Sequence, residues 1–282
     1  MNLRTTRRPN QGIKRRTVLS DSLLQLRDAL PKIKRIKVAN VVIGAGYTGV
    51  SLSSGEVGLA HSLLSEYASG CCELMKRAGR LSGSPALELA RLALSWDIRS
   101  RVVGVATLNA LSQGSLRNYA NRISTRRGDI ADHLDVRGDV VTVVGNIAPT
   151  IKKLRPKAKR VYVLERNPDL RDDDTLPDTA AEEVIPESDV VLITGTSIVN
   201  GTVDRVLELS RNAKEVALVG ATAGILPTVL FEHGATAVAT VKVKDPERVM
   251  RIIAEGGGTP SFADVVEFVI YRPSREHVRK NE

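Results

Sequence analysis

The sequence predicts two units of different fold class, an α+β domain followed by an α/β domain with a mainly parallel sheet. In the first unit, short apolar segments separated by Gly and Ser clusters precede three helical segments. Strands that precede helices in this way are typical of α+β packing, with the helices on one face of the sheet. In the second unit, continuous runs of Val, Ile and Leu alternate with helical segments. Such runs are typical of parallel strands that are buried on both faces.

The first domain is expected over residues 20–125. It begins with a predicted helix that has Ser20 as a candidate N-cap and ends at Pro31. Three short strands follow as a meander, because Gly and Ser clusters supply turns between them. The strands are expected at residues 36–43, 47–53 and 56–61, and the helices after them at about 64–78, 85–97 and 99–112. Ser84 is the candidate N-cap of the second of these helices.

The second domain is expected over residues 139–282, after a polar and weakly periodic linker at residues 126–138. Its strands are expected at residues 140–144, 161–164, 190–194, 216–220, 237–243 and 265–271. Helical segments between the strands make this half an open α/β sheet. Sheets of that kind bind ligands in the crevice at the carboxyl ends of their strands.

The composition is that of a globular protein. The chain has 282 residues, of which 42% are hydrophobic and 26% charged, enough for one large domain or two ordinary ones. Fibrous, disulfide-rich and mainly disordered classes are excluded. No stretch reaches the roughly 18 to 20 apolar residues of a membrane span. The first forty residues lack the apolar core and cleavage site of a signal peptide. We therefore expect a cytoplasmic protein with no membrane partner.

The net charge of +9 resides in the N-terminal segment. Residues 1–37 contain eleven Lys and Arg against two Asp, and the rest of the chain balances 30 basic with 30 acidic side chains. Residues 1–19 are therefore interpreted as a flexible basic arm. Such an arm can neutralise nucleic-acid phosphates. Aromatic residues for base stacking are only 3% of the chain and no nucleic-acid motif is present, so a solvated terminus is favoured and nucleic acid is not expected as a partner.

The segment GAGYTG at residues 44–49 matches the glycine pattern of dinucleotide-binding sites. That pattern works when a helix follows it, because the N-terminus of the helix holds the pyrophosphate. Here the next residues are VSLSSGEVG, which predict a hairpin. Glycines in a tight turn are therefore the favoured interpretation.

Polar residues follow several strands of the second domain. Gly145 and Asn146 come directly after the first strand. Glu165 ends the second strand, twenty residues after Gly145, at about the spacing at which an acidic group meets a ribose. An ion pair of Glu165 with Arg166 or a Lys is the alternative, and the sequence leaves the two open.

The loop after the third of these strands carries more hydroxyl and amide groups than one helix cap requires. Gly195, Thr196 and Ser197 are followed by Asn200 and Thr202. Either Asn200 or Thr202 can cap the next helix, which leaves the Thr196 and Ser197 hydroxyls for a phosphate, a carboxylate or a metal-bound ligand. Capping alone is the alternative.

A fourth loop belongs to the same edge of the sheet. Residues 219–227 repeat the pattern of small residues, with Thr222 among them, so backbone N–H groups can approach a ligand. The Gly run in residues 255–262 is either a helix terminator or a mobile flap.

Candidate metal ligands are isolated in the sequence. The four histidines are scattered, and none forms a ligand-spaced pair on a helix. They are His61, His133, His233 and His277. Cys71 and Cys72 are adjacent on a predicted helix, where successive side chains point about 100° apart, so joint ligation of one metal is awkward. The acidic run at residues 171–183 is interpreted as a solvated loop rather than a cation site.

Several segments together resemble the putative heavy-metal chelation family, in which an enolase N-terminal-like domain precedes a Rossmann-like domain. The resemblance covers residues 38–272 in the same order. Its segments are VIGAGYTGVSLSSGEVGLA, GVATLNAL, VVGNIAPT, ITGTSIVNGT, LVGATAGILP and EGGGT. The resemblance implies that the first domain caps a cleft at the strand ends of the second, and that the cleft binds a heavy metal or a metal chelator. It implies no enolase chemistry, because the barrel that carries those residues is absent.

The candidate site follows from these loops together with the resemblance. Its residues are Asn109, Gly145, Asn146, Glu165, Gly195, Thr196, Asn200, Thr202 and Thr222. Asn109, near the end of the third helix of the meander domain, either projects into the cleft or packs as a buried amide. The expected ligand is small and anionic, a metal or a metal chelate, and a divalent or heavy metal is the candidate cofactor. An enzyme that uses a nucleotide or S-adenosylmethionine-like cofactor is the alternative, and a homodimer fits either.

Overall fold

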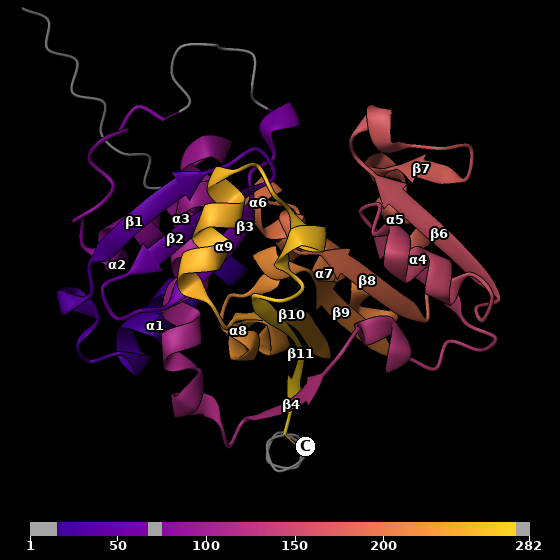
Figure 1. The fold of residues 1–282 in the computed structure, drawn as a ribbon. Helices are drawn as coiled ribbons and strands as arrows, with labels where there is room; N and C mark the ends of the chain where they lie inside the picture. The colour runs from indigo at the N-terminus through magenta and orange to yellow at the C-terminus, as the bar shows by residue number, and fades with distance from the viewer. Residues whose placement is uncertain (1–15, 67–74, 275–282) are drawn as a thin grey trace, which may run out of the picture.

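The computed structural model describes residues 16–66 and 75–274. These residues form a small three-stranded sheet with helices beside it and a large eight-stranded sheet with helices on both faces (Figure 1). The mixed α/β class, with one antiparallel and one mainly parallel sheet, is as the sequence predicts. Within the described ranges, no helix is long and apolar enough to cross a membrane.

The small unit is the predicted three-stranded meander. Its strands are β1 (Val38–Ile43), β2 (Tyr47–Leu52) and β3 (Val57–His61), and its helices are α1 (Val18–Ala29), α2 (Ala86–Ala90) and α3 (Ile98–Ser115). Neighbouring strands pair antiparallel. Between β1 and β2, the Gly44 N–H donates to the Tyr47 carbonyl at 2.9 Å. The GAGYTG segment is thus a tight turn between strands, as its context predicts.

Helix α1 begins earlier than the sequence suggested. The N-cap is Thr17, whose hydroxyl accepts from the Ser20 N–H while the Ser20 hydroxyl accepts from the Thr17 N–H. Ser20 is therefore not the N-cap but the third helical residue, because this reciprocal capping box satisfies two N–H groups and a cap at Ser20 satisfies one.

Of the three helices predicted after the meander, α3 is present, and the other two differ from expectation in their described residues. In the range 64–78, the described residues form a 3-10 turn at Leu64–Glu66 and hydrogen-bonded turns from Met75, and Cys71 and Cys72 lie outside the described residues. The helix predicted at 85–97 is α2 followed by a 3-10 turn at Arg91–Leu94, with Pro85 rather than Ser84 at its N-cap. The tighter turn places Ala93 directly against Gly104 of α3.

The large sheet has the strand order β4-β11-β10-β9-β8-β5-β6-β7. From β10 to β7 neighbouring strands run parallel, and β11 is antiparallel to β10 and β4. The strands are β4 (Ile123–Arg127), β5 (Val140–Val144), β6 (Arg160–Glu165), β7 (Thr175–Pro177), β8 (Val190–Thr194), β9 (Glu215–Val219), β10 (Ala237–Val243) and β11 (Val266–Pro273). The helices are α4 (Ala148–Leu154), α5 (Ala181–Val184), α6 (Thr196–Asn200), α7 (Val203–Leu209), α8 (Pro227–Glu232) and α9 (Pro246–Ala254).

All six strands predicted from apolar runs are present, and the two strands that the sequence missed are the two edges. Strand β4 falls in the polar stretch that was interpreted as a boundary and linker, and four of its five residues are exposed. Strand β7 falls inside the acidic run, which is therefore not wholly a loop. An edge strand needs little apolar surface, because its outer side faces solvent.

Apolar packing fixes the small unit against the large sheet. Leu108 of α3 shares one core with Ile198 of α6 on one face of the sheet. Leu59 of β3 shares another core with Val249 of α9. These contacts set where β3 lies relative to the strand ends.

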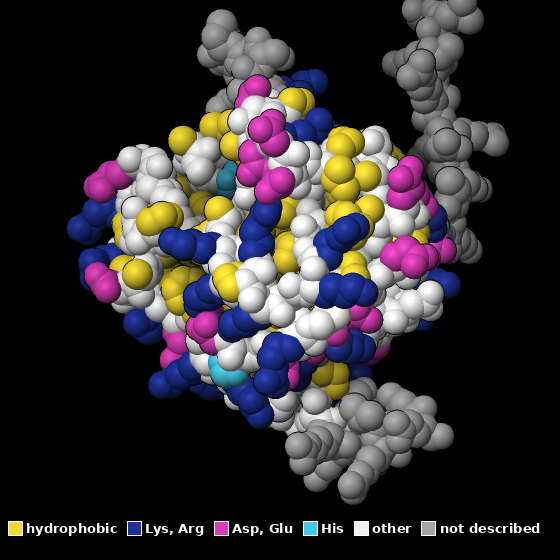
Figure 2. All heavy atoms as spheres, turned by 90° about the vertical axis from the view of Figure 1, so that its right-hand side faces the viewer, with side chains coloured by type: hydrophobic (Ala, Val, Ile, Leu, Met, Phe, Trp, Pro, Cys, Tyr) yellow, Lys and Arg dark blue, Asp and Glu magenta, His cyan; other side chains and the backbone are white. Residues whose placement is uncertain are grey.

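Charge on the folded body is mixed. Basic and acidic side chains are both spread over the face seen in Figure 2, with hydrophobic side chains between them. This distribution agrees with the balanced count of charges beyond residue 37.

Candidate functional site

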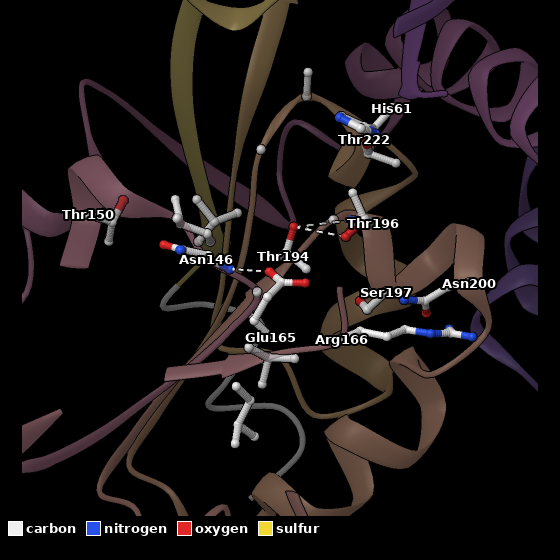
Figure 3. A pocket seen from close by; sticks show the side chains of 18 of the residues that line it. His61, Asn146, Thr150, Glu165, Arg166, Thr194, Thr196, Ser197, Asn200 and Thr222 are labelled. Atoms are coloured by element: carbon white, nitrogen blue, oxygen red, sulfur yellow. Dashed lines mark hydrogen bonds between the residues drawn. The ribbon is translucent and has the colours of Figure 1, made fainter. Parts of the chain in front are cut away.

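A cavity of about 1170 Å³ lies at the carboxyl ends of the parallel strands. Its walls include the loops after β5, β6, β8 and β9, together with Tyr47 and His61 of the meander. Figure 3 shows polar side chains from these separate segments pointing toward one another. The cavity therefore has walls from both units of the fold.

The position of the cavity follows from the strand order. The chain runs from β5 to β6 and β7 on one side of β5, then returns to β8 on the other side and continues to β9. The strand order therefore reverses between β5 and β8. At such a switch point the two loops diverge and open a crevice. Gly145 has φ +92°, and a Cβ there would lie 2.7 Å from Thr194 Cγ2, so this turn requires glycine.

Glu165 joins two of the loops. Its Oε2 accepts from the Asn146 N–H and its Oε1 accepts from the Asn167 N–H, both at 2.8 Å. The Asn146 side chain in turn donates to the Leu170 carbonyl at 3.0 Å. The predicted alternative of an ion pair with Arg166 is wrong, because backbone amides take the carboxylate and Arg166 faces Glu66 at 3.7 Å.

The loop after β8 supplies hydroxyl groups. Thr196 Oγ1 donates to Thr194 Oγ1 at 3.1 Å, so the Thr194 hydroxyl proton remains to be donated elsewhere. Ser197 Oγ is buried, lines the cavity and has no hydrogen-bond partner among the described residues. Buried hydroxyls are normally satisfied, so the unpaired Ser197 Oγ indicates a partner supplied by a ligand or water.

Asn200 and Thr202 interact with each other at the end of this loop. Asn200 Oδ1 accepts from both the N–H and the hydroxyl of Thr202, at 3.1 and 2.8 Å. Gly201 between them is left-handed, with φ +84°. Thr202 occupies the N-cap position of α7 without a side-chain capping bond, so the capping alternative does not account for its hydroxyl.

Eight of the nine predicted site residues line the cavity. They are Gly145, Asn146, Glu165, Gly195, Thr196, Asn200, Thr202 and Thr222. Asn109 does not, since it is only 1% exposed and its Nδ2 donates to the Leu59 carbonyl at 2.6 Å and the Thr222 carbonyl at 3.1 Å. It packs as a buried amide behind the wall, which is the second of its two predicted roles.

His61 lines the cavity, and sequence reasoning missed it. Its backbone N–H donates to Thr222 Oγ1 at 2.9 Å, and its Nδ1 accepts from the Leu63 N–H at 3.1 Å. The Tyr47 ring meets the imidazole edge-on, with ring centroids 5.4 Å apart. In the sequence, the one signal for His61 is its place at the end of a meander strand. The residue that it contacts at the cavity wall, Thr222, is 161 positions away in the chain, so no local pattern joins the two.

Burial lowers the pKa of His61 below the ordinary value of 6.5, so the ring is neutral at pH 7. We expect the His61 NMR signals to titrate below pH 6.5 and its Nε2 to carry the proton above that pH. The free energy of unfolding should fall as the pH drops below about 6.5, since the unfolded imidazole takes up a proton that the folded one resists. His61→Gln should flatten this acid limb, and an unchanged limb would contradict the assignment.

A family model described as "putative heavy-metal chelation" matches residues 129–272, just over half of the chain. The chain belongs to this family. A second family model with the same description matches residues 26–112, which cover most of the small unit.

Solved structures of proteins from the same family, DUF364, share the fold. One from Pyrococcus horikoshii, of unknown function, is 26% identical with a TM-score of 0.75, over 90% of this chain and 99% of the other. Another from Desulfitobacterium hafniense, also of unknown function, is 27% identical with a TM-score of 0.71, over 88% and 98%. An uncharacterised protein of Methanocaldococcus jannaschii is 36% identical over 166 residues, 58% of this chain and 62% of that relative's length.

The described part of the cavity does not hold a preformed metal cluster. No group of three or more His, Cys, Asp or Glu side chains in residues 16–66 and 75–274 is arranged to hold an ion. The cavity lining includes His61, Glu66 and Glu165, and each of these three already has a protein partner.

Proposed function

We propose that this protein binds or handles a small anionic ligand, a metal or a metal chelate in the cavity between the meander unit and the carboxyl ends of the large sheet. In this proposal the small unit is an enolase N-terminal-like domain that caps a Rossmann-like domain. The observation that carries it is the cavity itself, where eight independently predicted polar or glycine positions meet.

The size and chemistry of the cavity support a small-molecule ligand. Its volume of about 1170 Å³ is slightly above the roughly 300 to 1,000 Å³ typical of ligand sites, so a small molecule fits with room to spare. Apolar side chains such as Leu164 and Val219 supply part of the wall, and hydroxyl and amide groups converge on it from three loops. A few placed polar groups on an apolar body are how such sites fix the orientation of a ligand.

Native mass spectrometry of the purified full-length protein, with elemental analysis of the same sample, tests the proposal. A tight ligand or metal survives purification and adds a stoichiometric mass. Thr196→Phe, which places a ring among the converging loops, should abolish that adduct. An adduct that is retained in this variant would locate the binding elsewhere and reject the cavity.

Asn200→Ala should weaken ligand binding by about tenfold, which corresponds to roughly 1.4 kcal/mol. The variant removes the Oδ1 that orders Thr202 and the Nδ2 that faces the cavity side of the loop. The melting temperature should stay within a few degrees, because Asn200 is only partly buried. Affinity equal to that of the wild type, measured by calorimetry, would remove Asn200 from the site.

A further inference from the structure

We propose that the cavity recognises the anionic oxygens of a carboxylate chelator, free or metal-loaded, and that His61 contacts this ligand as a hydrogen-bond donor and not as a metal ligand. This inference rests on the proposed function and names its ligand class. It follows from which atoms of the cavity wall remain available after the bonds within the protein are counted.

The tautomer of His61 is set by the protein. Its Nδ1 accepts the Leu63 N–H at 3.1 Å, so the proton of the neutral ring is on Nε2. A metal bound at Nε2 requires the proton on Nδ1, where it would point at the Leu63 N–H. The bond to Leu63 therefore favours donation from Nε2 over coordination.

The residue that donates this bond has a strained backbone. Leu63 has φ 51°, the only positive φ among the described residues other than glycine. The left-handed conformation costs a leucine free energy, and it persists where surrounding contacts require it. The Leu63 side chain is buried, and the Tyr47 ring packs against the imidazole ring in a T-shaped arrangement. His61 is thus fixed both in orientation and in tautomer.

Donor groups line the same cavity as this imidazole. Thr222 Oγ1 accepts the backbone N–H of His61, so the hydroxyl proton of Thr222 is free for a ligand. Thr222 is 3% exposed. Thr194 likewise keeps its hydroxyl proton, and Ser197 Oγ is buried without a protein partner. Figure 3 shows Thr194 and Ser197 below His61 and Thr222 in the view. Oxygen atoms that carry negative charge are the partners that such donors select.

The acidic side chains that line the cavity, by contrast, already have protein partners in the described residues, with Asp178 as the one exception. Both oxygens of Glu165 accept backbone N–H groups, and Glu66 faces the Arg166 guanidinium. Arg166 also contributes positive charge to the cavity wall. The described donor set thus matches a ligand that brings its own metal-binding oxygens, and it does not match an uncomplexed heavy-metal ion.

Isothermal titration calorimetry on the full-length protein separates these ligands. The probes are Ni²⁺ alone, citrate alone and the 1:1 Ni²⁺–citrate complex, with wild type, His61→Ala, His61→Gln and Thr196→Phe. Citrate or its complex should bind the wild type, and His61→Ala should weaken it by about tenfold or more. His61→Gln should recover most of the affinity, because its amide N–H can replace the Nε2 donor. His133→Ala, at an exposed histidine outside the cavity, should bind like the wild type.

Each other outcome has a defined meaning. Tighter binding of Ni²⁺ alone than of either carboxylate probe, lost in both His61 variants, would make His61 a metal ligand and overturn the inference. No binding of citrate in either form would reject the carboxylate class. Loss of binding in Thr196→Phe, with both His61 variants unchanged, would reject the role of His61 and leave the proposed function standing. Binding that is unchanged in Thr196→Phe and in both His61 variants would reject the cavity as the binding site, and with it the proposed function.

Discussion

Gly58→Ala is expected to lower the free energy of unfolding by about 3 kcal/mol, the upper end of what overpacking a well-packed site costs. Strand β3 crosses α3 at this residue, and a Cβ there would lie 2.1 Å from the Ala106 carbonyl oxygen and 2.2 Å from the Ala110 nitrogen. Both neighbours are helix backbone, so neither can rotate away. The strand must therefore move, and His61 at its end must move with it. Urea denaturation should show a lower midpoint with an unchanged slope.

Gly46→Ala is the matched control. A Cβ at that residue would meet its nearest neighbour, the Gly257 oxygen, at 3.6 Å, an ordinary contact. Its free energy of unfolding should stay within about 1 kcal/mol of the wild type. Equal losses of unfolding free energy in the two variants would mean that the close approach of β3 to α3 is not the reason why position 58 requires glycine.

The strands could be predicted because burial leaves a direct mark on sequence. A strand such as VVLIT at residues 190–194 is apolar throughout, since both of its faces are covered. Edge strands leave a weaker mark. Strand β4 reads ISTRR and β7 is three residues long, and both are defined by pairing with a neighbour that is distant in sequence. The shortened α2 likewise depends on the contact of Ala93 with Gly104, which no local pattern encodes.

Most of the candidate site could be predicted because parallel strands place their carboxyl ends at one edge. Loops after β5, β6, β8 and β9 must then lie together, whatever their sequences. No comparable rule predicts which residues of the meander line the cavity. His61 faces the cavity and Asn109 lies behind it, and the difference depends on how β3 and α3 pack against the 3-10 turn at Ala221–Ala223. A histidine isolated in sequence carries no signal of that packing.

Asn109→Asp is expected to cost about 3 kcal/mol or more of unfolding free energy at pH 7, because it buries a charge with no compensating partner. The Asn109 Nδ2 lies 2.6 Å from the Leu59 carbonyl oxygen and 3.1 Å from that of Thr222. Aspartate puts a carboxylate oxygen against these carbonyls in place of a donor. Burial raises the pKa of such a carboxyl, so protonation should restore a donor and part of the stability as the pH falls toward 5.

Two further variants separate the causes in that result. Asn109→Ala removes the same bonds without adding charge, so its loss should be smaller, about 2 kcal/mol, and independent of the pH change that rescues the aspartate. Asn118→Asp makes the same chemical change at an exposed amide that donates to the Ala29 carbonyl, and it should stay within about 0.5 kcal/mol of the wild type. A pH-independent loss in Asn109→Asp would show that its carboxylate has moved away from the Leu59 and Thr222 carbonyls. Asn109 joins β3 to the turn that carries Thr222. Such a movement would therefore also shift Thr222 relative to His61, whose backbone N–H it accepts at the cavity wall.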